Sequence, residues 1–134
     1  MYDNAKVYEY AKVSGYAVVC THAEVSGAAQ VYEYARVFRN AKVCGNAIVD
    51  GNAHISGDAV VESNKDYIVF KNFWSSGRHF TWTRSNNMWK VGCFYGTGEE
   101  LIAKAYKDSD LCGRLYEYAV KSVNEMNKLL EEGE

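Results

Sequence analysis

A period of six residues dominates the first half of the chain. Alanine stands at every sixth position from Ala5 to Ala59, and an aliphatic residue follows each alanine two positions later, from Val7 to Val61. An amphipathic helix repeats its apolar positions about every 3.6 residues and an amphipathic strand about every 2, so neither element explains this spacing. The pattern predicts a coil of short strands, in which each hexad places one aliphatic residue and one alanine inside.

Glycine recurs in one slot of the repeat, as a backbone that bends tightly requires. With hexads such as Val7-Tyr8-Glu9-Tyr10-Ala11-Lys12, the chain resembles the hexapeptide-repeat family over roughly residues 3 to 63. The resemblance implies a left-handed parallel β-helix with three hexads in each triangular coil, and the repeat is long enough for about three coils. So short a β-helix has few internal contacts and two open ends, and we expect something to cap or flank it.

Wrapping the repeat at three hexads per coil stacks residues of successive coils in columns. Tyr16 and Tyr34 then share an outward column above Asn52, and Phe38 lies in another. Outward rings leave more apolar surface than a monomer usually exposes, which favours self-association. The resemblance implies trimers more often than other states, and a dimer is the alternative. The expected interface residues are Tyr16, Tyr34, Phe38, Leu115, Val123 and Met126.

The period of six stops after Val61, and residues 65–134 form a second predicted unit beside the repeat of residues 1–64. Aromatic and β-branched residues predict strands at 67–73 and 79–84, and a hairpin turn at 85–87 leads to a further strand segment at 88–96. Thr97 and Glu100 form the pattern of a helix-capping box, which opens a first helix over the segment LIAKAYKDS. A second helix is expected from about 110 to 131, with Leu111, Leu115, Ala119, Ser122 or Val123, Met126 and Leu130 buried. The sequence therefore predicts a mainly β protein: a parallel β-helix followed by a small α+β module.

Charge divides the second unit into a basic and an acidic half. Residues 65–96 contain five basic residues and one acidic residue, whereas residues 97–134 contain five basic and nine acidic residues. The aromatic side chains fall in the basic half, where cations and rings together suit an anionic ligand or a protein interface. The alternative is that the rings form the core and the cations only decorate it. The candidate binding residues are Arg78, Trp82, Arg84, Trp89 and Lys90.

Enzymatic activity is the second interpretation. Members of the hexapeptide-repeat family are best known as acyltransferases, which the resemblance implies would use an acyl-coenzyme A donor and a histidine near a subunit boundary. His22 and His54 occupy variable slots of the repeat, where exposed polar residues are common, and His79 with Cys93 is a conceivable pair across the hairpin. No catalytic residue is assigned, and no cofactor is expected.

The segment from Phe80 to Ser109 is similar to the C-terminal part of small uncharacterised proteins of bacteriophages and prophages, and the likeness covers roughly residues 66 to 125. That likeness implies an accessory role, such as acting on a host protein or intercepting a nucleotide signal of a host-defence system. The sequence therefore favours a non-catalytic, homo-oligomeric binding protein that engages a host protein or a small anionic ligand. Neither a membrane nor duplex nucleic acid is expected as a partner.

The cysteines and the chain start bear on the compartment. The four cysteines lie far apart without a Cys-x-x-Cys pair, so neither a metal site nor a disulfide framework is indicated. No stretch approaches the roughly 20 apolar residues that span a membrane, and the first residues do not resemble a secretory signal. We expect a cytoplasmic protein.

Overall fold

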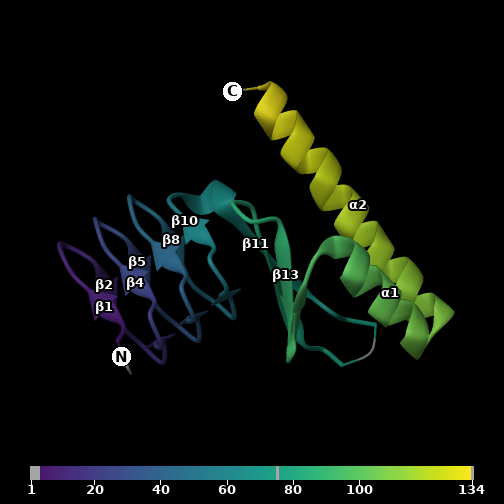
Figure 1. The fold of residues 1–134 in the computed structure, drawn as a ribbon, viewed down its shortest axis with the longest axis horizontal. Helices are drawn as coiled ribbons and strands as arrows, with labels where there is room; N and C mark the ends of the chain where they lie inside the picture. The colour runs from purple at the N-terminus through teal and green to yellow at the C-terminus, as the bar shows by residue number, and fades with distance from the viewer. Residues whose placement is uncertain (1–3, 75, 134) are drawn as a thin grey trace.

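A computed structural model describes residues 4–74 and 76–133. The chain forms a parallel β-solenoid of about 3 turns, followed by an antiparallel sheet and two helices. These three parts follow one another along the long axis of the molecule, with the sheet between the solenoid and the helices (Figure 1). The fold class predicted from the sequence is therefore confirmed.

The solenoid consists of two-residue strands, each centred on an inward aliphatic residue. They stack 18 residues apart into three parallel sheets, ordered β1-β4-β7-β10, β2-β5-β8 and β3-β6-β9, and Glu24 pairs with both Lys6 and Lys42, as the wrapped repeat predicts. The strands are β1 (Lys6–Val7), β2 (Lys12–Val13), β3 (Val18–Val19), β4 (Glu24–Val25), β5 (Gln30–Val31), β6 (Arg36–Val37), β7 (Lys42–Val43), β8 (Ile48–Val49), β9 (His54–Ile55) and β10 (Val60–Val61).

The solenoid core is the column of repeat alanines and aliphatic residues. From Val19 to Val61 these side chains are fully buried, whereas Val7 and Val13 of the first two strands are only partly buried. Outside, the rings of Tyr16 and Tyr34 stack with their centroids 5.3 Å apart, which confirms their predicted column.

The second unit begins with a single 3-10 turn and continues as a four-stranded sheet and two helices. Gly92, with a φ of 54°, breaks the predicted strand segment 88–96 into two strands. The predicted capping box is confirmed, because the Thr97 hydroxyl accepts from the Glu100 N–H and the Glu100 carboxylate accepts from the Thr97 N–H. The elements are η1 (Asn64–Asp66), β11 (Tyr67–Lys71), β12 (His79–Thr83), β13 (Met88–Val91), β14 (Phe94–Gly96), α1 (Gly98–Asp108) and α2 (Asp110–Glu132).

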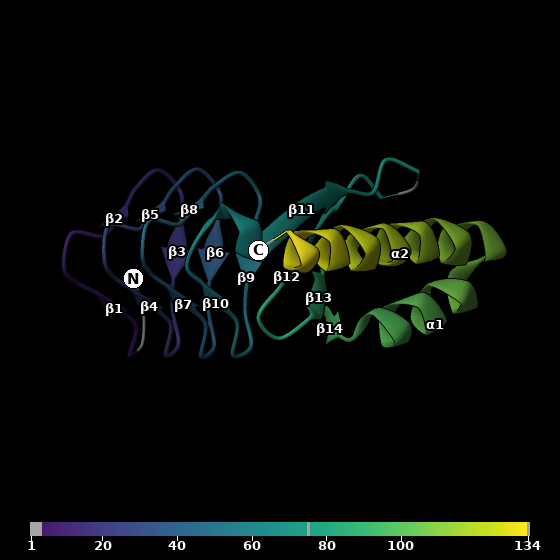
Figure 2. The same cartoon turned by 90° about the horizontal axis from the view of Figure 1, so that it is seen from above.

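Both faces of this sheet are covered. In β11, Tyr67 and Val69 pack against the solenoid core, whereas Ile68 and Phe70 pack against the core beneath the helices. In β12, Phe80 and Trp82 belong to the helix-side core. Figure 2 shows the sheet between the last solenoid turn and the two helices. The sheet is thus the middle layer of the molecule, and each strand divides its side chains between two cores.

Helix α2 buries Val123, as one of the predicted alternatives, but the rest of its buried stripe differs from the predicted one. Its buried residues are Gly113, Tyr116, Val120 and Val123, whereas Leu111 and Met126 are exposed. Gly113 lets the Tyr106 ring of α1 approach closely, since a Cβ at this glycine would collide with that ring. Tyr116 faces the sheet, with its ring centroid 5.0 Å from that of Phe80. Val123 is fully buried, so it is not available to a second chain, which corrects one expected interface residue.

The backbone N–H groups of the last solenoid turn donate hydrogen bonds to side chains of the second unit. In earlier turns the first residue of each strand donates its N–H to a carbonyl of the next turn, as Lys6 does to Ala23 and Gln30 to Ala47. In the last turn no further coil follows. The N–H groups of Ile48, His54 and Val60, six residues apart, instead donate to Asn64 Oδ1 at 3.1 Å, Thr81 Oγ1 at 3.0 Å and Ser85 Oγ at 2.8 Å.

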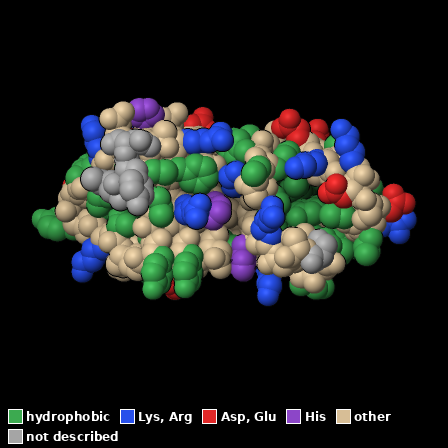
Figure 3. All heavy atoms as spheres, turned by 90° about the horizontal axis from the view of Figure 1, so that it is seen from below, with side chains coloured by type: hydrophobic (Ala, Val, Ile, Leu, Met, Phe, Trp, Pro, Cys, Tyr) green, Lys and Arg blue, Asp and Glu red, His purple; other side chains and the backbone are tan. Residues whose placement is uncertain are grey.

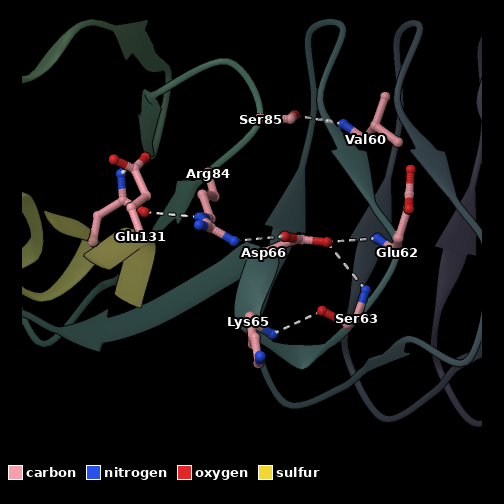
Figure 4. A network of polar contacts seen from close by, with 9 residues as sticks. Val60, Glu62, Ser63, Lys65, Asp66, Arg84, Ser85 and Glu131 are labelled. Carbon is pink, nitrogen blue, oxygen red and sulfur yellow. Dashed lines mark hydrogen bonds and ion pairs between the residues drawn. The ribbon is translucent and has the colours of Figure 1, made fainter. Parts of the chain in front are cut away.

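Two further contacts complete this end cap, which we define as Asn64, Asp66, Tyr67, Thr81 and Ser85. Asp66 Oδ2 accepts from the N–H of Glu62 at 2.8 Å, as Figure 4 shows together with the Ser85 contact. The Tyr67 hydroxyl donates to the Ile48 carbonyl at 2.7 Å. A buried backbone donor without an acceptor costs about 1–3 kcal/mol, and the part-buried Thr81 contact avoids this cost. The contacts of Asn64, Ser85 and Asp66 are exposed to solvent and therefore contribute less. None of the helices that the structure describes is long and apolar enough to cross a membrane.

The end cap predicts a ranking of two substitutions at Thr81, which is buried. Thr81→Val keeps the shape but removes the acceptor of the His54 N–H, and we expect it to lower the free energy of unfolding by about 1–3 kcal/mol. Thr81→Ser keeps the acceptor and loses one methyl group, so it should cost less. Urea unfolding of both variants measures the difference. If serine costs more than valine, Thr81 contributes through packing alone and the predicted hydrogen-bond role is wrong.

Candidate functional site

Three of the five candidate binding residues support the fold. Trp82 and Trp89 are 2% and 1% exposed, in the core between the sheet and the helices, and the Trp82 indole N–H donates to Asn87 Oδ1 at 2.8 Å. The Arg84 Nε donates to Asn127 Oδ1 at 2.7 Å, and its Nη1 lies 3.9 Å from Asp66 Oδ1 (Figure 4). The two rings are therefore not available to a ligand, and Arg84 ties η1 to α2. The alternative that the rings form the core holds for both tryptophans.

The other two candidates, Arg78 and Lys90, meet at the turn that contains Gly92. The Lys90 ammonium donates to the Gly92 carbonyl, and a Cβ at Gly92 would collide with the Arg78 guanidinium. Arg78 lines a cavity between the sheet and the helices. Lys90 extends toward the solenoid, where its Nζ lies 5.8 Å from the centroid of the Phe38 ring. The two cations thus serve different surfaces on either side of this turn.

On the solenoid side, Lys90 belongs to a group of basic and aromatic side chains that both units supply. The Phe38 ring also contacts the His54 ring edge to face, with centroids 6.3 Å apart, and the Arg39 guanidinium lies 5.6 Å from the centroid of the Tyr95 ring. In the backbone register of the solenoid, Arg36 of β6 lies opposite His54 of the adjacent strand β9. We call this surface the junction face and define it as Arg36, Phe38, Arg39, His54, His79 and Lys90.

Positive charge accumulates on the junction face. Burial lowers the pKa of His54, and the charges of Arg36, Lys90 and His79 lower it further. The pKa of Lys90 is also lowered, first by burial and then by the charge of Arg39. Both shifts have the same physical cause, because cations at close range and loss of water disfavour the charged forms.

Few carboxylates balance these charges. Within residues 4–74 and 76–133, the ion pairs given by the structure involve Arg84 and Lys121, and neither residue is on the junction face. Asp58 lies near Tyr95, whose pKa burial raises and Asp58 raises further, and it accepts a hydrogen bond from Asn86 at 3.2 Å. Figure 3 shows Lys, Arg and His side chains gathered at the middle of one face, where the solenoid meets the second unit. Clustered cations with few carboxylates give this part of the surface a positive potential.

The remaining sequence candidates are distributed over the molecule. His22 is exposed at a solenoid corner. His79 lies on the junction face, and Cys93 is exposed in the β13–β14 turn; the described part of the chain contains no hydrogen bond between them. Phe38 is half-buried against Lys90 and His54, so its main contacts are within the chain.

Sequence reasoning missed Arg36, Arg39 and His54 as candidate binding residues. The wrapped repeat places Arg36 beside His54, which is a usable signal. The sequence does not show which of the three solenoid faces lies next to the second unit. A comparison of the chain with known protein families, curated proteins and solved structures found no match.

Proposed function

We propose that this chain is a non-catalytic binding protein whose junction face captures a small phosphorylated, nucleotide-like anion. The observation that carries the proposal is the Lys90 ammonium, 5.8 Å from the centroid of the partly exposed Phe38 ring, with Arg39 near enough to lower the pKa of Lys90 and Arg36 near enough to lower that of His54. None of these three cations takes part in an ion pair that the structure gives for the described residues. Arginine offers planar donors to phosphate oxygens, and an aromatic ring offers an apolar surface to a base.

The site requires both units. Arg36, Phe38 and Arg39 come from the solenoid, whereas His79 and Lys90 come from the sheet. The end cap fixes the two units relative to each other through Thr81, which lies in the same strand as His79 and bonds to the N–H of His54. A ligand that bridges the two groups of cations would therefore bind only to the intact chain.

A phage-type accessory role fits this proposal. The likeness of the C-terminal segment to bacteriophage and prophage proteins supports a setting in which capture of a nucleotide signal would inhibit a host-defence system. Engagement of an acidic segment of a host protein is the competing use of the same face, since carboxylates would meet the same cations. The two uses differ in the size of the partner and are separated by the binding test below.

An acyltransferase is the second candidate function, and the lowered pKa of His54 is the observation that favours it. A neutral histidine at pH 7 can accept a proton from a hydroxyl or amine acceptor. That function requires consumption of acetyl-coenzyme A that the His54→Gln variant loses. A non-catalytic binder shows no such consumption.

Binding of ATP tests the proposed function, with inorganic phosphate and a polyglutamate peptide as comparison probes. Calorimetry should detect ATP binding that weakens at least tenfold, about 1.4 kcal/mol, in the Arg39→Gln/Lys90→Gln variant. Affinity should rise as the pH falls through the lowered pKa of His54, below 6.5, because the imidazolium then adds a positive charge. The His54→Gln variant should lose that part of the pH dependence.

The Lys121→Gln/Lys128→Gln variant is the matched control, because it removes the same charge from exposed positions of α2. Equal weakening in both double variants would mean that net charge alone attracts ATP, and the junction face would have no specific role. Binding of polyglutamate without ATP binding would favour the acidic protein partner.

We also propose that the chain forms a homo-oligomer, a trimer or a dimer, through the solenoid tyrosines. Tyr16 and Tyr34 are 75% and 58% exposed although their rings stack, and such rings bury large apolar area in an interface. Leu115 is half-buried and Met126 is exposed on α2, where they offer a second contact surface.

Light scattering at micromolar concentration should therefore show particles of two or more chains, and Tyr16→Ser/Tyr34→Ser should shift them toward single chains. Tyr118→Ser is the matched control and should leave the particle size unchanged, because Tyr118 is an exposed tyrosine of α2 outside the proposed interface. A strictly monomeric wild-type chain would contradict the proposal.

A further inference from the structure

A second cavity lies on the helix side of the Gly92 turn and shares no residue with the junction face. Its volume is about 310 Å³, and its residues come from the loop between β11 and β12, from β13, β14 and the turn between them, from α1 and from the start of α2. Its apolar lining comes from two layers, with a sheet wall of Val91 and Phe94 and an α1 wall of Leu101 and Ala105. Apolar side chains at the boundary of two packed layers suit an apolar ligand body.

Tyr116 supplies a buried hydrogen-bond donor to this cavity. It lines the cavity and is 5% exposed. Its hydroxyl oxygen accepts from Asn72 Nδ2 at 3.1 Å, and in the described part of the chain no acceptor is present for its own proton. Burial raises the pKa of Tyr116, so the hydroxyl keeps this proton at neutral pH. The hydroxyl can therefore donate this proton to an oxygen of a ligand in the cavity while it still accepts from Asn72.

Two cations stand at the mouth of the same cavity. Arg78 and Lys104 are both exposed and both line it. The charge of Arg78 acts on the Tyr116 hydroxyl, since it partly offsets the rise of the Tyr116 pKa that burial causes. The Lys104 Nζ lies 5.4 Å from the centroid of the Phe94 ring, at the edge of the apolar wall. Asp108 is the one carboxylate among the lining residues, so one positive charge remains.

We propose that this cavity binds a small aromatic carboxylate. The carboxylate accepts the Tyr116 proton and pairs with Arg78 and Lys104, while the ring lies between the sheet wall and the α1 wall. A single negative charge matches the remaining positive charge, and Asp108 disfavours a second one. The apolar walls distinguish this ligand from an inorganic anion. The site is independent of the proposed function at the junction face, because it uses other residues and a different ligand class.

Calorimetry with indole-3-acetate tests the proposal on the full chain. We expect binding at least tenfold tighter than that of the neutral isostere indole-3-acetamide, and no detectable binding of acetate, which lacks the ring. Arg78→Gln should weaken indole-3-acetate binding at least tenfold, whereas Lys71→Gln, an exposed cation of the same sheet outside the cavity, should leave it unchanged. Equal binding of acid and amide, or no effect of Arg78→Gln, would overturn the proposal.

Thiol alkylation locates the ligand independently of these substitutions. Cys93 and Cys112 line the cavity, whereas Cys20 and Cys44 lie in the solenoid. Saturating indole-3-acetate should slow alkylation of Cys93 and Cys112, measured by mass spectrometry, and leave that of Cys20 and Cys44 unchanged. If indole-3-acetate leaves the alkylation rate of each of the four thiols unchanged, any bound molecule lies elsewhere and the site is refuted. Tyr116→Phe should weaken binding as well, and loss of its hydroxyl also removes the acceptor of Asn72.

Discussion

The unpaired backbone donors of the last solenoid turn are the constraint on which the rest of the molecule depends. A parallel solenoid satisfies its N–H groups only where another coil follows, and the repeat ends at Val61. Side-chain oxygens of Asn64, Thr81 and Ser85 take the place of the next coil on all three faces. An open sheet edge would otherwise invite pairing with other chains. The second unit is therefore part of the solenoid's structure as well as an appended module.

Capping also decides where the aromatic residues go. The sheet covers the solenoid with one face and carries α1 and α2 on the other, so its large rings are needed inside. The charged side chains stay at the surface, near the strand ends and in the turns at the edge of the sheet. Lys90 and Arg78 lie on either side of Gly92 for this reason, and the two proposed sites follow from that division.

The repeat made the solenoid predictable in detail. A strict spacing of six defines inward residues, strand positions and columns, and the Tyr16–Tyr34 stack follows directly from it. The capping box of Thr97 and Glu100 was equally readable, because it depends only on local sequence. These features share one property, which is that residues close in sequence or in repeat register determine them.

Features that depend on the meeting of two units were not predictable in the same way. Arg84 was a candidate binding residue because it is a cation among aromatic residues, yet its guanidinium contacts Asp66 and Asn127 within the chain. Trp82 and Trp89 are buried because the helices cover their face. In α2 the apolar residues Leu111 and Met126 suggested a buried stripe, whereas the small size of Gly113 decided the contact with α1. The junction face was not predictable, because the sequence does not show which solenoid face lies next to the sheet.

Native-state amide hydrogen exchange of the full chain tests the end cap most directly. The N–H groups of Ile48, His54 and Val60 should exchange as slowly as those of Gln30, Arg36 and Lys42, which hold the same slots one turn earlier and bond to the next coil. Equal protection in the two sets would show that side chains replace the missing coil. Exchange of Ile48, His54 and Val60 at the rate of unprotected amides, with the earlier set still protected, would contradict it.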